Sequence, residues 1–246
     1  LAQRTFAAAL VNIAAGLDPE KVTLFVQSHV PEHTELSWVF TTLTPLGDLT
    51  RMTQFKDKAS KQETVWSGLL MYPVLQAADI LIYKADTVPV GEDQVQHIEL
   101  TREIARRFNH LFGETFPEPQ ALLNPEAPRV PGIDGKAKMS KSLGNTIGLL
   151  EPEESIWQKI QHLPDDPQRI RLSDPGDPER TILFTYLSYF APKDLVEALK
   201  EEYRKAGVGT YVVKRILFDH LMEALRPIRE RAEALKKDPD YVMAAL

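Results

Sequence analysis

The stretch ADTVPVGEDQVQHIELTREIARRFNHLF, residues 85–112, places three local patterns in one continuous run. Residues 85–90 are apolar and β-branched, which predicts a short buried strand, and the glycine and acids of residues 91–94 predict a turn. From Gln94 onward, apolar residues recur at spacings near 3.6, which predicts an amphipathic helix. A strand that runs through a tight turn into a helix indicates an α/β architecture.

The flanking segments extend this pattern in both directions. Residues 21–27 (KVTLFVQ) predict a buried strand, residues 31–44 a helix that begins at a proline, and residues 68–83 a helix around Pro73. Residues 113–137 are rich in proline and glycine and predict a long connector. After residue 150 the patterns are helical only, so we expect an α/β domain over residues 1–150 and an α-helical domain over residues 151–246.

Composition excludes several classes of protein. With 246 residues and 43% hydrophobic residues the chain can bury a large core, and the absence of cysteine excludes disulfides and thiolate metal sites. The apolar runs 69–75 and 80–83 are separated by Gln76 and Asp79, so no membrane span is expected. The six histidines lack the spacing of metal ligands, and we expect no metal site and a cytoplasmic location.

A lysine-rich loop is the first candidate site. The segment GKAKMSKSLGN, residues 135–145, offers ammonium groups and backbone donors that suit a polyphosphate. Composition alone favours an ordinary solvated lysine-rich loop.

Two further candidates lie on the α/β part of the chain. Tyr72, Gln76 and Asp79 follow one another at i, i+4 and i+7, which predicts a polar stripe facing inward from an otherwise apolar helix. Asp93, at the carboxyl end of the predicted strand, lies where open α/β sheets bind ligands. The alternatives are a structural hydrogen-bond network around Asp79 and a helix cap at Asp93.

Taken together, these segments resemble a known family. The string KMSKS at residues 138–142, with VPVGEDQ at residues 88–94 and YPVLQAADIL at residues 72–81, is similar to the tryptophanyl-tRNA synthetases of class I. The resemblance extends over essentially the whole chain, including RMTQFKDK at residues 51–58. It implies a Rossmann-like parallel-sheet catalytic domain, followed by an α-helical domain that meets the tRNA anticodon.

The resemblance also assigns roles to residues. It implies that Lys138 and Lys141 stabilise the charge on departing pyrophosphate, and that Asp79 accepts a hydrogen bond from the indole N–H of tryptophan. The implied ATP contacts are Gly91, Glu92, Asp93, Val130, Lys138, Met139, Ser140, Lys141 and Ser142. The implied tryptophan contacts besides Asp79 are Tyr72, Gln94, Gln76, Val88 and Val90. At the position of Gln76 many relatives carry methionine.

The activity implied by the resemblance is a two-step ligation. L-Tryptophan reacts with ATP and Mg²⁺ to give tryptophanyl-adenylate and pyrophosphate, and the acyl group then passes to the 3′ end of tRNA(Trp), in a homodimer. A tyrosine-specific enzyme of the same class and a non-catalytic RNA-binding relative remain alternatives. The first ATP motif of the family is absent, and we expect it to precede Leu1. Basic residues of the C-terminal region are candidate phosphate contacts: Lys214, Arg215, Arg226, Arg229, Arg231, Lys236 and Lys237.

Overall fold

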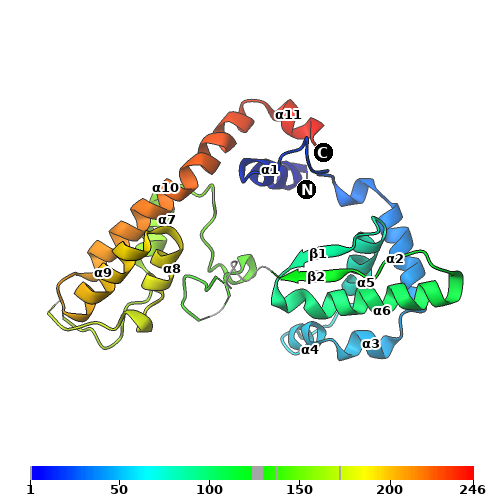
Figure 1. Cartoon of the computed structure of the whole chain (residues 1–246), viewed down its shortest axis with the longest axis horizontal. Coiled ribbons are helices and arrows are strands. Elements are labelled where there is room, and N and C mark those ends of the chain that lie inside the picture. Colours follow the sequence, from blue (N-terminus) through cyan, green and yellow to red (C-terminus); the bar gives the residue numbers. More distant parts are fainter. Residues whose placement is uncertain (1, 124–129, 137, 172) are drawn as a thin grey trace. The chain divides into compact units, whose positions relative to one another are not determined.

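The computed structural model describes residues 2–123, 130–136, 138–171 and 173–246. Its backbone forms two compact units. The sheet unit comprises Val26–Pro128, and the helical unit comprises Leu1–Phe25 together with Arg129–Leu246. The helices and strands of each unit are labelled in Figure 1.

The sheet unit is built around a β–α–β crossover. Strands β1 (Thr87–Val90) and β2 (Gln120–Leu123) pair in parallel, with Thr87 opposite Gln120, and the 18-residue helix α6 (Val95–Phe112) connects them. Parallel strands require such a crossover because the chain must return to the same end of the sheet. The prediction of an α/β class with a parallel sheet is therefore confirmed.

Strand β2 lies inside the segment that was predicted to be a connector throughout. Its sequence, QALL, is too short for a period-two pattern, and the strand exists because β1 supplies a partner for it.

Four more helices complete the sheet unit: α2 (Glu32–Leu43), α3 (Leu46–Arg51), α4 (Thr53–Ala59) and α5 (Ser67–Leu81). Helix α5 packs against both α2 and α6. Phe40 of α2, Leu81 of α5 and Ile104 of α6 are each 0% exposed in the resulting core. The predicted helices at residues 31–44 and 68–83 are confirmed.

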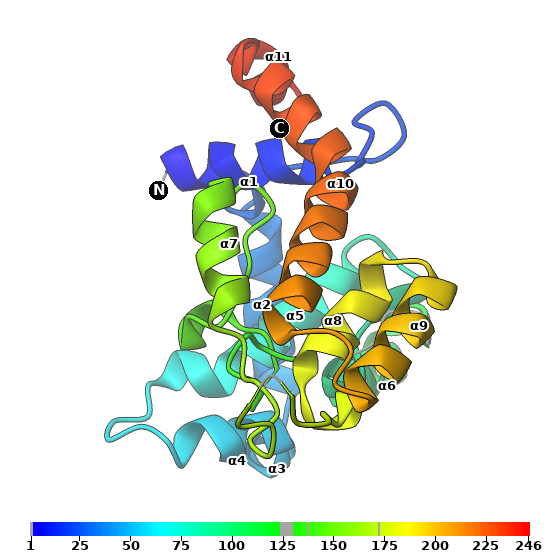
Figure 2. The same ribbon diagram turned by 90° about the vertical axis from the view of Figure 1, so that its left-hand side faces the viewer.

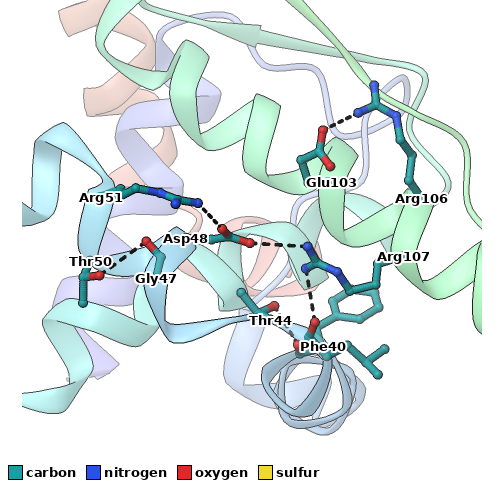
Figure 3. Close-up of polar contacts among 10 residues, drawn as sticks. Phe40, Thr44, Gly47, Asp48, Thr50, Arg51, Glu103, Arg106 and Arg107 are labelled. Atoms are coloured by element: carbon teal, nitrogen blue, oxygen red, sulfur yellow. Dashed lines mark hydrogen bonds and ion pairs between the residues drawn. The ribbon is translucent and has the colours of Figure 1, made fainter.

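Arg107 of α6 makes polar contacts with the end of α2 and with α3 (Figure 3). Arg107 of α6 donates to the carbonyl oxygen of Leu43 over 3.1 Å and to Asp48 Oδ2 over 3.4 Å. Asp48 Oδ1 also accepts from Arg51 over 2.6 Å. Arg107 thus satisfies a carbonyl at the end of α2, where the helix itself supplies no donor.

The predicted strand at residues 21–27 is wrong. Residues 23–26 are neither helix nor strand, and Gln27 begins a short 3-10 helix (Gln27–His29). β-Branched residues favour extended backbone, but a strand also needs ladder pairing, and the sheet of the described residues consists of β1 and β2. The boundary between the two compact units falls within this segment.

The helical unit contains α1 (Ala2–Ala14), α7 (Glu153–Gln161), α8 (Ile182–Phe190), α9 (Lys193–Arg204), α10 (Thr210–Lys236) and α11 (Pro239–Ala244). Helices α7 and α8 pack along α10, and α9 packs on α8. The core between them includes Ile156, Leu187 and Leu217, which are at most 1% exposed.

The first helix belongs to the same unit as the last two. Helix α1 crosses the C-terminal part of α10 and contacts α11 (Figures 1 and 2). Ile13 packs with Ala232 and Val242 there, and Arg231 donates to the carbonyl oxygen of Ala14 over 2.7 Å. The compact units therefore differ from the expected division at residue 150, because these contacts join residues more than two hundred positions apart.

None of the described helices is long and apolar enough to cross a membrane.

We predict that Phe40→Ala lowers the free energy of unfolding by about 3–5 kcal/mol. Phe40 is 0% exposed, and Phe108 and Phe116 pack edge-on against its ring, so the substitution leaves a cavity beside these two aromatic rings. Chemical denaturation of the two proteins would measure the change. Trp38→Ala on the same helix removes a side chain of a residue that is 69% exposed and is the matched control. Equal losses in the two variants would contradict this assignment of the core.

Candidate active site

Helix α5 separates an apolar face from a polar one. Its buried residues are Pro73, Val74, Ala77, Ala78 and Leu81. Tyr72, Gln76 and Asp79 lie on one face, as predicted, but all three are only half-buried. The prediction that this stripe faces inward is corrected: the apolar face packs into the core, and the polar stripe lies at its edge.

The carboxylate of Asp79 has two neighbours in the sheet unit. Gln27 Nε2 donates to Oδ1 over 2.8 Å and to Oδ2 over 2.9 Å. His33 Nδ1 lies 2.6 Å from Oδ1, and His33 Nε2 lies 2.8 Å from the hydroxyl oxygen of Tyr83. The Asp79 side chain is 33% exposed, so it also remains accessible from outside.

Tyr72 is held by a second histidine. Its hydroxyl oxygen lies 2.9 Å from Nε2 of His97, which is 0% exposed, and Lys58 Nζ lies 4.7 Å from the centre of the Tyr72 ring. Burial, with the nearby charge of Lys58, lowers the pKa of His97, and Asp93 opposes that shift. The lowered pKa favours a neutral His97 imidazole beside the Tyr72 hydroxyl.

The turn at Gly91 brings Asp93 and Gln94 together. Gln94 Nε2 donates to Asp93 Oδ2 over 3.1 Å. Gly91 and Gln94, the N-cap residues of the short helix Glu92–Gln94 and of α6, make no side-chain cap hydrogen bond. A Cβ atom at Gly91 would lie 2.9 Å from Asp93 Oδ1, so glycine leaves room for this carboxylate.

Val88 and Val90 share one face of β1. Both are half-buried, whereas Thr87 and Pro89 are exposed, so the strand alternates and is not buried on both faces as predicted. The reason is that β1 has β2 as its neighbour and no further strand in the described part of the chain.

The lysine-rich loop belongs to the helical unit and is organised by Asn145, which is 3% exposed. Asn145 Oδ1 accepts from the Ser140 N–H over 2.7 Å, and Nδ2 donates to the Lys138 carbonyl and to Asp134, each over 3.3 Å. The Asn145 carbonyl accepts from the Ile133 N–H over 3.0 Å. One buried amide thus holds the backbone on both sides of Met139 in the KMSKS segment, residues 138–142, here called the signature loop.

The loop presents its basic residues outward while its apolar residue points to the core. Lys138 and Lys141 are exposed, and Met139 packs on the core of the helical unit and donates its N–H to the Val130 carbonyl over 3.0 Å. Ser140 is half-buried, and the side chain of Ser142 lies outside the described residues. Gly144 adopts φ +65°, a left-handed conformation that ends the turn Lys141–Leu143.

Other candidate groups have structural partners. Lys214, Arg229 and Arg231 donate to backbone carbonyl oxygens of their own unit, which argues against the phosphate contacts expected for them. Arg102 and Arg106 pair with Glu118 over 3.0 and 2.7 Å. Within the described ranges, no three histidine, aspartate or glutamate side chains are arranged to hold a metal ion.

Each unit carries its own group of candidate residues. The sheet unit gathers Tyr72 and Asp93 around His97, and places Asp79 with Gln27 and His33. The helical unit carries Lys138 and Lys141. Gln27, His33 and His97 were missed by sequence reasoning because their partners lie 25 to 52 positions away, beyond any local pattern.

Comparison with known proteins identifies the family of this chain. The family model of the class I tRNA synthetases (W and Y) matches residues 1–226. The chain belongs to this family.

Its relatives in the family are tryptophan–tRNA ligases. The chain is 60% identical over 246 residues to that of Deinococcus radiodurans, covering 100% of this chain and 74% of the relative. The enzyme of Thermotoga maritima is 46% identical over 234 residues, which are 94% of this chain and 71% of the relative. The resemblance to tryptophanyl-tRNA synthetases is confirmed.

Solved structures of the family share the fold. The tryptophanyl-tRNA synthetase of Campylobacter jejuni, determined with ADP and tryptophan, has a TM-score of 0.87 at 36% identity and covers 99% of this chain and 76% of its own. The expected Rossmann-like class is confirmed by this similarity. A tyrosyl-tRNA synthetase from Archaeoglobus fulgidus has a TM-score of 0.64 at 23% identity, covers 91% of this chain and 70% of its own, and shows the fold alone.

We predict that acidification destabilises this member of the family partly through His97. The folded state lowers the pKa of His97 below 6.5, so the unfolded chain takes up the proton first as the pH falls. The stabilisation is present above pH 6.5 and is lost as the pH falls below it, with a slope of up to about 1.4 kcal/mol per pH unit. His97→Gln, which keeps a partner for Tyr72, should reduce the slope of unfolding free energy between about pH 7 and 5. His110→Gln, exposed on the same helix, is the control, and an unchanged slope in His97→Gln would refute the prediction.

We predict that Asn145→Ala loosens the signature loop. The substitution removes the Asn145 hydrogen bonds to the Ser140 N–H and to the Lys138 carbonyl, at a cost of about 0.5–1.5 kcal/mol for each bond. Hydrogen-exchange mass spectrometry should show faster exchange in the peptide that covers residues 138–145. Leu143→Ala, at a residue that is 61% exposed in the same loop, should leave exchange unchanged. Protection retained in Asn145→Ala would show that the amide does not hold the loop.

Proposed function

We propose that this protein is a tryptophan–tRNA ligase that activates L-tryptophan with ATP and transfers it to tRNA(Trp). The observation that carries the proposal is 60% identity along the entire chain to a tryptophan–tRNA ligase. The polar stripe of α5 supports it, because an accessible carboxylate lies there within an otherwise apolar segment.

Amino-acid selection rests on Asp79. The indole N–H is the only polar group of the tryptophan side chain, and a hydrogen bond to an ionised acceptor contributes about 1.5–3 kcal/mol. Phenylalanine would leave the carboxylate without that donor, and a site built to pair with a substrate N–H rejects such an analogue strongly. Tyr72 and Gln94 are the proposed contacts of the substrate ammonium, and Val88 and Val90 the apolar wall.

The role of Gln76 follows from its place. It lies between Tyr72 and Asp79 on the half-buried face of α5, where its amide would contact the indole edge.

Nucleotide binding rests on the turn at Gly91 and on the signature loop. Gly91 and Asp93 would contact the ribose, Glu92 would lie beside it, and Val130, Met139, Ser140 and Ser142 would line the phosphate side. Mg²⁺ enters as part of the ATP substrate, bound to its phosphates.

The chemistry consists of an in-line displacement at the α-phosphorus. A carboxylate oxygen of tryptophan forms a bond to that phosphorus while the bond to the pyrophosphate oxygen breaks, and pyrophosphate leaves. Lys138 and Lys141 stabilise the charge that builds on it, so catalysis rests on orientation and positioned cations. A ribose hydroxyl of tRNA then takes the acyl group and AMP leaves.

Residues 1–150 would serve as the catalytic domain and residues 151–246 as the tRNA-binding domain, in a cytoplasmic homodimer. These assignments follow from the family resemblance. A tyrosine-specific enzyme is less well supported, because relatives that are 60% and 46% identical over 94% or more of this chain are tryptophan–tRNA ligases. A non-catalytic relative would retain the fold but not the activity.

The test is amino-acid-dependent exchange of pyrophosphate into ATP. We expect exchange with tryptophan and none above background with tyrosine or phenylalanine. Exchange with tyrosine and not with tryptophan would show that the protein is a tyrosine-specific enzyme. Exchange with none of the three amino acids would show that it is a non-catalytic relative.

We predict that replacing both Lys138 and Lys141 with alanine lowers tryptophan-dependent exchange by at least about 10²-fold, because two positioned cations are removed. Tryptophan affinity, measured by calorimetry, should change little, since both lysines belong to the unit that does not contain Asp79. Lys136→Ala, at an exposed lysine outside the five-residue signature, is the matched control. Full exchange activity in the double variant would refute the catalytic role of the loop.

A further inference from the structure

The hydrogen bonds around Asp79 form a chain that crosses from α2 to α5. His33, near the start of α2, is 1% exposed, and each of its ring nitrogens lies within 2.8 Å of an oxygen, one on Asp79 of α5 and one on Tyr83 just after that helix. His33 therefore does more than fill space in the interior, because each of its two ring nitrogens contacts a different polar side chain.

The proton positions follow from the chemistry of the partners. An ionised carboxylate only accepts hydrogen bonds, so His33 Nδ1–H donates to Asp79 Oδ1. In the neutral imidazole Nε2 is then an acceptor, and the Tyr83 O–H donates to it. The resulting order of donation is Tyr83 to His33 to Asp79, with the imidazole tautomer set by the Asp79 carboxylate.

The two oxygens of Asp79 are used unequally. Oδ1 accepts from both His33 and Gln27, whereas the structure gives Oδ2 the shared Gln27 amide as its partner. A carboxylate oxygen accepts about two hydrogen bonds, so Oδ2 retains capacity for another donor. Because the side chain is 33% exposed, that donor can come from a ligand.

We propose that His33, assisted by Gln27, is a positioning residue that fixes the Asp79 carboxylate and presents Oδ2 to the indole N–H of tryptophan. This inference rests on the proposed function. Without His33 the carboxylate could rotate about its side-chain bonds. Tryptophan binding would then also have to order the Asp79 side chain, and this entropic cost would offset part of the hydrogen-bond energy with the indole. The effect is confined to ligands that carry the donor.

The experiment compares two substitutions at one position. In His33→Asn the amide nitrogen stands close to the place of Nδ1 and can still donate to Asp79, whereas in His33→Gln the amide reaches the place of Nε2 and the contact with Asp79 is lost. Steady-state pyrophosphate exchange is measured with tryptophan and with benzothienylalanine, in which sulfur replaces the indole N–H.

We expect His33→Gln to raise the KM for tryptophan by roughly 10-fold, because part of the charge-assisted hydrogen bond with the indole N–H is lost. The KM for ATP, and the KM for benzothienylalanine, should stay within about threefold of wild type, less than the tenfold that corresponds to 1.4 kcal/mol. His33→Asn should restore most of the tryptophan KM. His29→Gln, at an exposed histidine four residues earlier, is the matched control.

Gln27→Met provides a second variant at an exposed position, where folding is not at risk. It removes the donor to both oxygens and should raise the KM for tryptophan but not for benzothienylalanine. Equal changes for the two amino acids, or no change in any variant, would overturn the inference while leaving the ligase function intact. Absence of tryptophan-dependent exchange in the wild-type protein would instead refute the proposed function.

Discussion

Burial of one face of α5 is the constraint on which the sheet unit depends. Val74, Ala77, Ala78 and Leu81 are each 0% exposed and pack between α2 and α6. Removing this much apolar surface from water fixes the rotation of the helix about its axis. Once that rotation is fixed, the remaining face must carry Tyr72, Gln76 and Asp79 to the edge of the core, so packing and ligand recognition follow from the same contact.

A comparable constraint organises the signature loop. The loop carries two exposed lysines whose mutual repulsion opposes a compact conformation, yet the buried amide of Asn145 bonds to the backbone groups on either side of Met139. Gly132 permits this arrangement, because a Cβ atom there would lie 2.0 Å from Asn145 Nδ2. The side chains of Lys138 and Lys141 therefore extend from a backbone that hydrogen bonds hold in place.

Much of the fold follows from local patterns. The helices at residues 31–44, 68–83 and 95–112 were predicted because apolar residues recur on one face of each. The strand at residues 87–90 was predicted because its residues are apolar and β-branched and a turn follows it. The strand at residues 120–123 was missed, and the one at residues 21–27 was wrongly predicted, because strand formation depends on a distant partner. For the site, the string KMSKS and the segment around Asp79 were sufficient to indicate the family.

The sequence by itself determined the type of chemistry. Two lysines in a glycine-bounded loop, an acid at the end of a strand and a carboxylate within an apolar helix are properties of adjacent residues, and these resemble one family. Tertiary structure alone decided that His33 and Gln27 surround Asp79, that His97 holds Tyr72, and that the first helix packs on α10. The physical reason is that each of these contacts joins side chains far apart in the chain, whose meeting depends on the packing of whole helices and not on any spacing that a sequence displays.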